Sequence, residues 1–274
     1  MAKEVYIVTG GTGGIGKAIV ADLCGRDEVK SILLACRNVA KAQQFASDMA
    51  MKSPAKEFIV IPLDLESFAS VRAFAEEVIN RGYEVRALFH NAGTMPGDVR
   101  VTTDGYESAT QTNFLSPMLL TELLADRLLP GGSVVFTTSM TRRIAHFIPD
   151  WADKSISRHN RFVTYGRSKK MLTAYALMLA ARLRDRDVRV NCSDPWIVDT
   201  GIITMGNKVI DRLSNMLFRP LIYTPGQGAA SALAALDSTL SGYIFTRKNH
   251  IPIPDSYASR NICDIISKAY SAIK

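Results

Sequence analysis

The chain has 274 residues, of which 47% are hydrophobic and 22% charged, a balance that excludes an intrinsically disordered protein and allows one large α/β domain or two small ones. Its formal net charge of +7 is dispersed and no nucleic-acid motif surrounds the basic residues, so we expect an anionic cofactor or substrate, or plain surface charge, and no nucleic acid. The first apolar run starts by residue 5 and no window approaches ~20 apolar residues, which leaves no room for a targeting peptide and predicts no membrane span.

Short apolar runs alternate with longer helical patterns along the chain. The expected strands are 4–9, 30–36, 57–62, 86–90, 132–138, 188–193 and 242–246. The expected helices are 15–25, 39–51, 67–81, 105–129, 162–185 and 226–237. Several strand runs are apolar on consecutive positions, which is typical of parallel strands buried on both faces. The pattern predicts an α/β fold, a single Rossmann-type doubly wound sheet of about seven parallel strands with helices on both faces, as one domain over 1–274.

Two segments, 140–161 and 195–224, interrupt the alternation, and both follow expected strands. Ligands bind beyond the carboxyl ends of the strands in such sheets, so we expect both segments to be substrate loops. Their aromatic and apolar residues favour an apolar substrate pocket, although ordinary packing explains them equally well. The tail 251–274 has no chemistry that the sequence reveals.

Residues 9–16, Thr-Gly-Gly-Thr-Gly-Gly-Ile-Gly, lie between the first expected strand and the first helix. This order lets the backbone approach a pyrophosphate and set it against the positive end of a helix. The spacing fits three dinucleotide-binding patterns, namely Gly11, Gly13 and Gly16; Thr9, Gly10, Gly14 and Gly16; or Gly10, Gly13 and Gly16. Spacing does not choose among them, and an ordinary glycine-rich turn is the alternative.

The residues at the end of the second expected strand indicate whether NAD(H) or NADP(H) binds. An NAD site places an acidic residue about 20 positions beyond the glycines, on the ribose hydroxyls. Here that position is Cys36, followed by Arg37 and Asn38. A guanidinium binds a 2′-phosphate through two parallel charge-assisted bonds, so we expect NADP(H) to be preferred over NAD(H). The alternative is that Arg37 is a solvated loop residue.

Tyr165 and Lys169 stand four apart in the expected helix 162–185, which puts both on one face. A phenol titrates near pH ~10, and a neighbouring ammonium lowers that value and makes the tyrosine a usable acid or base. Ser139 follows the strand 132–138 at the carboxyl edge, where its hydroxyl reaches a substrate oxygen. Asn91-Ala92-Gly93 ends the fourth strand, and Asn113 lies in the next helix.

Together these motifs, in this order, resemble the short-chain dehydrogenase/reductase family, in its single-domain branch. The resemblance runs from residue 4 to about residue 246. Ala35–Asn38, Thr112–Leu115 and the long gap from Ser139 to Tyr165 look like the retinol dehydrogenase and protochlorophyllide reductase-like group.

The resemblance implies a role for each matching position. Tyr165 is the implied acid/base, Ser139 polarises the substrate oxygen, and Lys169 lowers the pKa of the tyrosine and binds the nicotinamide ribose. Asn113 is expected to anchor a water that links Lys169 to solvent. The expected cofactor contacts are Gly10, Thr12, Gly14, Ile15, Gly16, Arg37, Asn38, Asp64, Leu65, Asn91, Ala92, Gly93, Tyr165, Lys169, Pro195, Val198 and Thr200. Plain structural alternatives remain for Asn113 as a helix backbone partner, for Ser139 as a strand-end cap and for Asp64 as a turn residue.

One position departs from the family, which has Pro-Gly after the sixth strand where this chain has Pro195-Trp196. An indole there would roof the cofactor, narrow the pocket or force the turn outward. The leading hypothesis is an NADP(H)-dependent oxidoreductase that transfers a hydride between nicotinamide and a carbonyl or alcohol carbon of a small, apolar substrate. The alternative is an NADP-binding regulatory or scaffold protein with little catalysis.

The remaining expectations concern assembly and location. The family implies a homodimer or homotetramer through the helices 105–129 and 162–185. Four cysteines, at 24, 36, 192 and 263, lack the paired spacing of zinc sites, so we expect no metal and no disulfide framework, and a cytoplasmic protein.

Overall fold

The computed structural model of the chain describes residues 3–146, 160–196 and 223–274. Within these residues, eight strands form one sheet in the order β3-β2-β1-β4-β5-β6-β7-β8. Their bounds are β1 (Lys3–Thr9), β2 (Ser31–Cys36), β3 (Glu57–Pro62), β4 (Tyr83–His90), β5 (Leu128–Thr137), β6 (Arg189–Ser193), β7 (Tyr243–Phe245) and β8 (His250–Pro252). The strands from β3 to β7 pair in parallel, and β8 pairs antiparallel with β7. The doubly wound sheet is confirmed, with an antiparallel edge strand added to the predicted parallel set.

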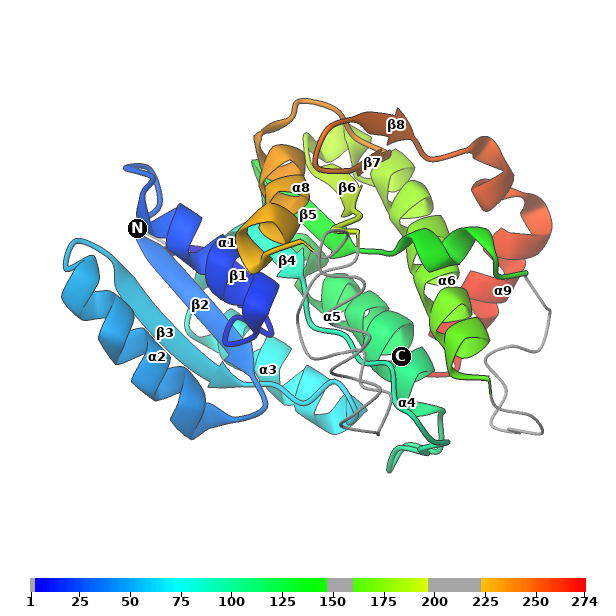
Figure 1. The fold of residues 1–274 in the computed structure, drawn as a ribbon, viewed down its shortest axis with the longest axis horizontal. Coiled ribbons are helices and arrows are strands. Elements are labelled where there is room, and N and C mark those ends of the chain that lie inside the picture. The colour runs from blue at the N-terminus through cyan, green and yellow to red at the C-terminus, as the bar shows by residue number, and fades with distance from the viewer. Residues whose placement is uncertain (1–2, 147–159, 197–222) are drawn as a thin grey trace.

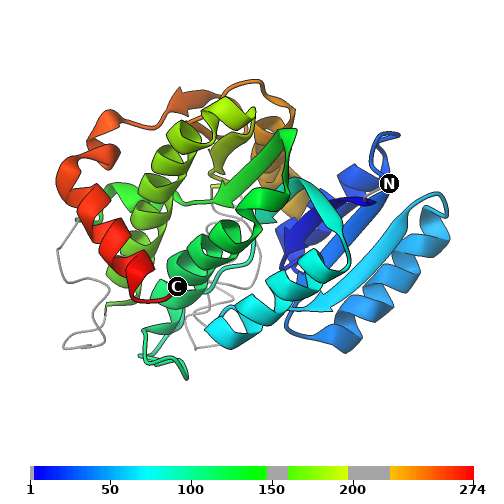
Figure 2. The same cartoon turned by 180° about the vertical axis from the view of Figure 1, so that it is seen from behind.

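Helices cover both faces of the sheet. Their bounds are α1 (Gly14–Cys24), α2 (Val39–Lys52), α3 (Phe68–Asn80), α4 (Ser108–Thr110), α5 (Ser116–Leu124), α6 (Arg161–Arg182), α8 (Pro225–Asp237) and α9 (Arg260–Ser271). Alternate residues of β1 point to opposite faces, with Val8 in the core under α1, α2 and α8 and Ile7 in the core under α3, α5, α6 and α9. Figure 1 shows α1 and α2 in front of the sheet, and Figure 2 shows α3 and α9 in front from behind. The consecutive apolar residues of the strands are therefore explained by burial on two sides.

The expected helix 105–129 is wrong as a single element. It consists of α4, a π-helical turn over Gln111–Leu115, α5, and a 3-10 turn over Ala125–Arg127, after which β5 starts at Leu128. Apolar periodicity runs through the whole stretch, so the sequence pattern does not reveal the π turn. The side chain of Asn113 in that turn donates to the Thr94 carbonyl at 2.8 Å and accepts from the Thr94 amide at 2.8 Å. These tertiary bonds hold the widened turn in place, as is common where π-bulges serve a site.

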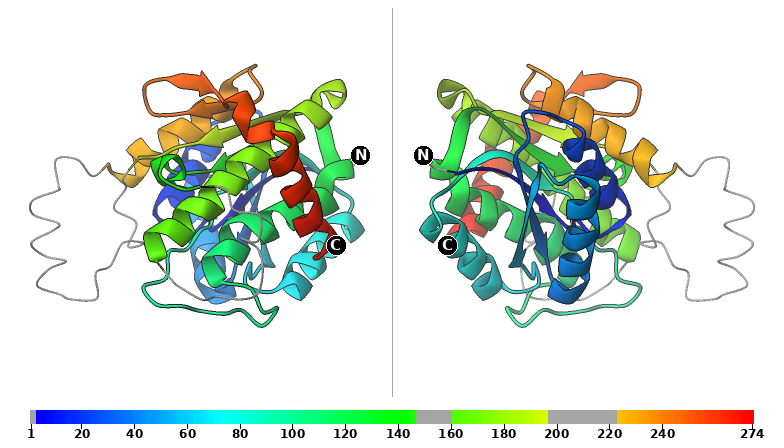
Figure 3. Two further views of the ribbon diagram at one scale, coloured as in Figure 1. Left: turned by 90° about the vertical axis from the view of Figure 1, so that its right-hand side faces the viewer. Right: turned by 90° about the vertical axis from the view of Figure 1, so that its left-hand side faces the viewer.

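The tail forms structure that the sequence reading did not predict. In α9, the buried residues Ile262, Ile265, Ile266 and Ala269 lie on one face at helical spacing. That face joins the core that also contains α5 and α6, and Figure 3 shows α9 in red beside them. The dimer interface expected on these two helices stays a prediction, and α9 covers part of that surface.

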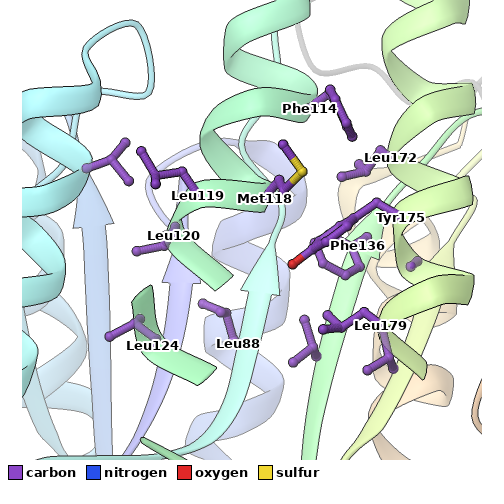
Figure 4. Close-up of a cluster of buried hydrophobic side chains, with 14 of the residues drawn as sticks. Leu88, Phe114, Met118, Leu119, Leu120, Leu124, Phe136, Leu172, Tyr175 and Leu179 are labelled. Atoms are coloured by element: carbon purple, nitrogen blue, oxygen red, sulfur yellow. The ribbon is translucent and has the colours of Figure 1, made fainter. Parts of the chain in front are cut away.

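The core between α5, α6 and the sheet fixes the helix that carries Tyr165. Phe136 of β5 meets the Tyr175 ring edge-on, with centroids 5.7 Å apart, and Figure 4 shows both rings beside Met118 of α5. The Tyr175 hydroxyl donates to Glu122 at 2.6 Å, so this buried polar tip is satisfied. Replacing a fully buried aromatic ring such as Phe136 by alanine would destabilise the fold by about 3–5 kcal/mol.

The order of the strands creates a switch point between β1 and β4, where the chain reverses its direction of travel across the sheet. Ligands bind in the crevice at the carboxyl ends of the strands at such a point. The glycine turn after β1 and the Asn91-Ala92-Gly93 segment after β4 both lie there. Among the helices of the described residues, none is long and apolar enough to cross a membrane.

Candidate active site

The glycine turn is locked onto the end of β4 by polar contacts. The Thr9 hydroxyl donates to the Phe89 carbonyl at 3.1 Å and accepts from the amides of Asn91 and Ala92, both at 3.0 Å. The side-chain amide of Asn91 donates to the carbonyls of Thr9 and Gly10 at 3.0 and 3.3 Å. Asn91 therefore shapes the turn from beneath, and its predicted contact with the cofactor stays a prediction.

Two glycines of the turn are required by its geometry. Gly10 has φ +64°, and a Cβ there would lie 3.1 Å from Ala92 Cα. A Cβ on Gly16 would lie 2.3 Å from the Gly10 carbonyl oxygen, which no side chain tolerates. The two dinucleotide-binding patterns that contain Gly10 account for this left-handed residue. The pattern that begins at Gly11 does not.

The first helix offers an anion site at its start. Gly13 is the N-cap of α1 and supplies no side-chain cap, and the first turn has no acidic residue. The amides of such a turn attract an anion because the helix dipole is positive at this end. Thr12, Gly14 and Ile15 are partly exposed around this turn. These residues fit the pyrophosphate of a dinucleotide.

A cavity of 370 Å³ lies beside the turn, between β1, β2 and β4. Its lining includes the predicted residues Gly10, Thr12, Arg37, Asn38, Asp64, Leu65, Ala92 and Gly93. It also includes residues that were not predicted: Thr9, Ala35, Cys36, Lys41, Leu63, Glu66, Thr94, Arg100 and Thr112. The predicted adenosine-side residues are thus brought to one cavity by four separate segments of the chain.

Three cations and two carboxylates set the charge of this cavity. Arg37, Lys41 and Arg100 line it together with Asp64 and Glu66. Glu66 accepts from Arg100 at 2.9 Å and from the Ser108 hydroxyl at 2.7 Å, and it lies 4.0 Å from Arg37. One carboxylate therefore holds two arginines from opposite walls, and the positive charge stays in excess, which fits a phosphate group.

Two of the predicted cofactor residues, Asn38 and Asp64, also form hydrogen bonds within their own loops. The Asn38 side chain caps α2 by accepting from the Lys41 amide at 2.9 Å. The Asp64 carboxylate accepts from the Glu66 amide at 3.0 Å, which makes it the turn residue of the plain alternative. Both still line the cavity, so each shapes the adenosine side through its loop.

Ser139 and Tyr165 are brought together by close packing of two elements. Ser139 caps the 3-10 turn Met140–Arg143 after β5, and its hydroxyl accepts from the Thr141 hydroxyl at 3.1 Å. A Cβ on Gly166 would lie 2.8 Å from the Thr141 carbonyl oxygen, so only glycine lets this turn reach α6. The Ser139 side chain acts on the Tyr165 phenol and lowers its pKa, and Tyr165 remains partly exposed.

Lys169 and Asn113 meet beneath this pair at Gly93. The Lys169 ammonium donates to the Thr137 carbonyl at 2.7 Å and lies 5.6 Å from the centre of the Tyr165 ring. A Cβ on Gly93 would lie 3.3 Å from Lys169 Nζ and 3.1 Å from Asn113 Oδ1. The side-chain amide of Asn113 also donates to the Ser168 hydroxyl at 3.1 Å. The four predicted catalytic residues therefore converge, and the water expected at Asn113 stays a prediction.

The protonation of this group differs from the expectation. Burial raises the pKa of Tyr165 to about 12, against the hydrogen bond from Ser139, which lowers it, and Asp194 raises it further. Burial lowers the pKa of Lys169 to about 8, against Cys192 and Asp194, which raise it. The lowering of the Tyr165 pKa that the resemblance implied is not found, because the ammonium sits over the ring and the burial of this partly exposed residue outweighs the other effects.

Trp196 adopts a backbone conformation that favours glycine. Its φ is +66°, and its side chain is 47% exposed. Its amide donates to Asp194 Oδ1 at 3.3 Å, and Pro195 between them is partly exposed. The predicted contacts at Val198 and Thr200 lie outside the described residues, as does most of both predicted substrate loops.

The profile of the short chain dehydrogenase family matches residues 4–208. The chain belongs to this family. Retinol dehydrogenase 12 of Homo sapiens is 31% identical over 232 residues, which cover 84% of this chain and 72% of that protein. This similarity confirms the retinol dehydrogenase-like group. A short-chain dehydrogenase is an oxidoreductase of alcohol or carbonyl groups with a nicotinamide cofactor, and the site residues present here fit that cofactor.

Two solved structures show the same architecture. A protein from Mycobacterium Paratuberculosis superposes with a TM-score of 0.76 at 22% identity, covering 99% of this chain and 92% of that chain. A short chain dehydrogenase from Burkholderia cenocepacia in complex with NADP gives a TM-score of 0.68 at 21% identity, covering 89% of this chain and 95% of that chain. At these identities the likeness concerns the fold alone, and it agrees with the doubly wound sheet.

Several residues of this short-chain dehydrogenase site escaped the sequence reading. Lys41 lies in the first turn of α2, whereas Arg37 precedes its N-cap Asn38, so helical spacing does not link the two and no local pattern marks Lys41. Arg100 and Glu66 come from segments far apart in the chain, and no local pattern marks them. Arg142 and Asp194, which lie behind Ser139, also carry no motif.

Proposed function

We propose that this dehydrogenase is an NADP(H)-dependent oxidoreductase that interconverts a carbonyl and an alcohol on an apolar small molecule, with Tyr165 as the acid/base. One observation carries the proposal: Gly93 lines the adenosine-side cavity and also faces Lys169, since a Cβ on Gly93 would lie 3.3 Å from Lys169 Nζ, which lies 5.6 Å from the centre of the Tyr165 ring. A nucleotide bound along the glycine turn would therefore extend to the tyrosine. When bound, the nicotinamide supplies or accepts the hydride.

The preference for NADP(H) is supported by the charges around the cavity. Arg37, Lys41 and Arg100 provide three cations, and Cys36 stands where an acidic residue would bind ribose hydroxyls. Of the two carboxylates in the lining, Glu66 is already bound to Arg100 and Ser108, and Asp64 accepts from the Glu66 amide. A 2′-phosphate would find donors on both walls of the cavity, whereas a ribose hydroxyl would use few of them.

The protonation states favour proton donation to a substrate oxygen. A phenol whose pKa is about 12 keeps its proton at neutral pH, so Tyr165 is ready to donate it to the oxygen of a carbonyl substrate. Ser139, whose side chain acts on the same phenol, would also bind that oxygen. The Lys169 ammonium would attract the ribose hydroxyls next to the nicotinamide and help to stabilise the phenolate left after the proton transfer.

An apolar substrate is supported by side chains at the carboxyl edge of the sheet. Ile144 after β5, Phe162 at the start of α6 and Trp196 after β6 are 65%, 43% and 47% exposed. Large apolar side chains gathered on the segments around a polar catalytic pair are typical of a pocket for an apolar ligand. Retinol dehydrogenase 12 is a relative whose name specifies such a molecule.

The proposal is tested by following NADPH oxidation with decanal, benzaldehyde, all-trans-retinal and cyclohexanone. NADPH binding is measured separately by calorimetry. Turnover of at least one apolar aldehyde, with NADPH bound more tightly than NADH, is the expected result. Tight NADPH binding without turnover of any carbonyl compound would instead support the regulatory or scaffold alternative.

A further inference from the structure

A buried ion pair lies directly behind the catalytic serine. Arg142 follows β5 and Asp194 follows β6, and their side chains are only 3% and 5% exposed. The two groups are in direct contact through Arg142 Nη1 and Asp194 Oδ2. Two buried charges are stable only when each is paired with the other, so removal of one partner leaves an uncompensated buried charge.

Each member of the pair also binds a turn that reaches the site. Arg142 Nη1 donates to the Ser139 carbonyl at 2.7 Å, which fixes the residue that carries the catalytic hydroxyl. Asp194 Oδ1 accepts from the Trp196 amide at 3.3 Å, and the Asp194 amide donates to Phe245 of β7 at 2.8 Å. The ion pair therefore connects the turn at Ser139, the serine turn, to the turn at Pro195-Trp196, the tryptophan turn.

The tryptophan turn needs such a support. Trp196 holds φ +66°, a conformation that side chains other than glycine rarely adopt. Strained residues persist only when the surroundings determine their position. Nearly half of the Trp196 side chain is exposed, so core packing alone does not hold it. Within the residues that the structure describes, the bond that the Trp196 amide donates to Asp194 ties this turn to the ion pair.

We propose that Arg142 and Asp194 are positioning residues that clamp the Ser139 turn to the Trp196 turn, so that the Ser139 hydroxyl and the Trp196 side chain keep one fixed separation. The clamp rests on the proposed function for its catalytic consequence, but its structural claim stands independently. Neither residue touches the reacting atoms. Both act through the backbone of Ser139 and Trp196.

The pair also places a negative charge behind the tyrosine. Asp194 acts on both Tyr165 and Lys169, with Arg142 held against it, whereas burial raises the pKa of Cys192 to about 12 and lowers the pKa of His90 to about 3, so these two neighbours of Lys169 are neutral near pH 7. Asp194 raises the pKa of both Tyr165 and Lys169. A variant that removes this charge should therefore lower both values, and a variant that keeps it should not.

Fluorescence tests the clamp without any substrate. The chain has two tryptophans, so in a Trp151→Phe background the emission comes from Trp196 alone. Asp194→Asn removes the charge, and Asp194→Glu keeps it but moves the carboxylate by one methylene. Both should increase acrylamide quenching of Trp196 at least twofold. Asp237→Asn, which breaks the exposed Arg26–Asp237 pair with contacts of 2.5 and 3.0 Å, is the matched control and should leave quenching unchanged.

Kinetics test the consequence for catalysis, with decanal as the probe. Asp194→Asn should lower kcat by roughly 10- to 100-fold, because small misplacements of reacting groups have effects of that size, while the Kd of NADPH changes less than twofold. In the pH profile of Asp194→Asn, the loss of activity at alkaline pH should begin at a lower pH than in the wild type. In Asp194→Glu, the alkaline loss of activity should begin at the wild-type pH although kcat falls.

The outcomes separate the clamp from the proposed function. Wild-type quenching and wild-type kcat in either folded Asp194 variant would overturn the clamp. If Asp194→Asn does not fold, Asp194→Glu decides in the same way. If the wild type itself turns over no carbonyl compound, the proposed function fails, and the quenching comparison still decides whether the two turns are clamped.

Discussion

Removing the Arg37 guanidinium should weaken binding of NADPH and leave binding of NADH unchanged. A charge-assisted hydrogen bond contributes about 1.5–3 kcal/mol in a well-ordered setting. Arg37 is 68% exposed and Glu66 lies 4.0 Å away, so solvent and the carboxylate screen much of this interaction. We expect Arg37→Ala to lose about 1 kcal/mol of NADPH binding, which is about a fivefold rise in Kd.

The same cavity gives a companion change of opposite sign. Glu66→Gln removes the negative charge between Arg37 and Arg100, so NADPH should bind more tightly, while NADH should respond less. Arg81→Ala is the matched control, because Arg81 is 45% exposed at the end of α3 and does not line the cavity. Calorimetric titration of each variant with both nucleotides measures all these values.

Two results would refute this reasoning. Equal losses for NADPH and NADH in Arg37→Ala would mean that Arg37 contacts a part shared by both nucleotides. An unchanged NADPH Kd in that variant, together with an unchanged Kd in Glu66→Gln, would mean that the 2′-phosphate does not bind at this corner of the cavity.

Three further predictions concern the site and its stability. Trp196→Gly should raise the free energy of unfolding, measured in urea titrations, by about 1 kcal/mol, because glycine adopts φ +66° without strain. The same variant should raise kcat/KM for bulky aldehydes. A less stable variant would contradict the first expectation. Burial lowers the pKa of Lys169 to about 8, so the ammonium is present below that pH and lost above it. The value of kcat/KM for carbonyl reduction should therefore fall as the pH rises through 8. A kcat/KM that stays constant up to pH ~10 would exclude a role for the ammonium. Burial lowers the pKa of His90 from 6.5 to about 3, so unfolding takes up a proton between these values and stability is lost as the pH falls below 6.5. The wild type should lose about 2 kcal/mol more between pH ~7 and ~5 than His90→Gln, measured by urea unfolding, and equal losses would contradict the assignment.

The sheet was largely predictable because its strands are buried on two sides. Runs such as Ile32-Leu33-Leu34-Ala35 have no polar alternation, and their burial in two separate cores explains this. The edge strand β8 was not predictable, because three exposed residues that include Pro252 form it by pairing with β7. Tertiary pairing, which leaves no local signal there, determined that element.

The helices show where periodicity fails. The π turn around Asn113 interrupts a stretch whose residues are buried all round, so the repeat of apolar positions gives no sign of it. The helix α9 did have a signal, since Ile262, Ile265, Ile266 and Ala269 follow helical spacing. The tail carries no chemical motif, and this helical spacing is its one signal of structure.

The site was predictable where one residue type is needed at one position. Gly10 and Gly16 are required by a left-handed turn and a close approach, and Lys169 follows Tyr165 by one helical turn. Arg100 and Glu66 became visible only in three dimensions, because the fold brings distant loops to one cavity. The direction of the Tyr165 pKa was also inaccessible, since burial outweighs a lysine that the helix places over the ring.

The most direct measurement is kcat of Tyr165→Phe with NADPH and an aldehyde that the wild type reduces, together with the Kd of NADPH. A positioned acid contributes roughly 10²–10⁴-fold, so kcat should fall by at least about 100-fold while Kd stays within about twofold. Turnover retained in the phenylalanine variant at close to the wild-type rate would contradict the assignment of Tyr165 as the acid and, with it, the proposed chemistry.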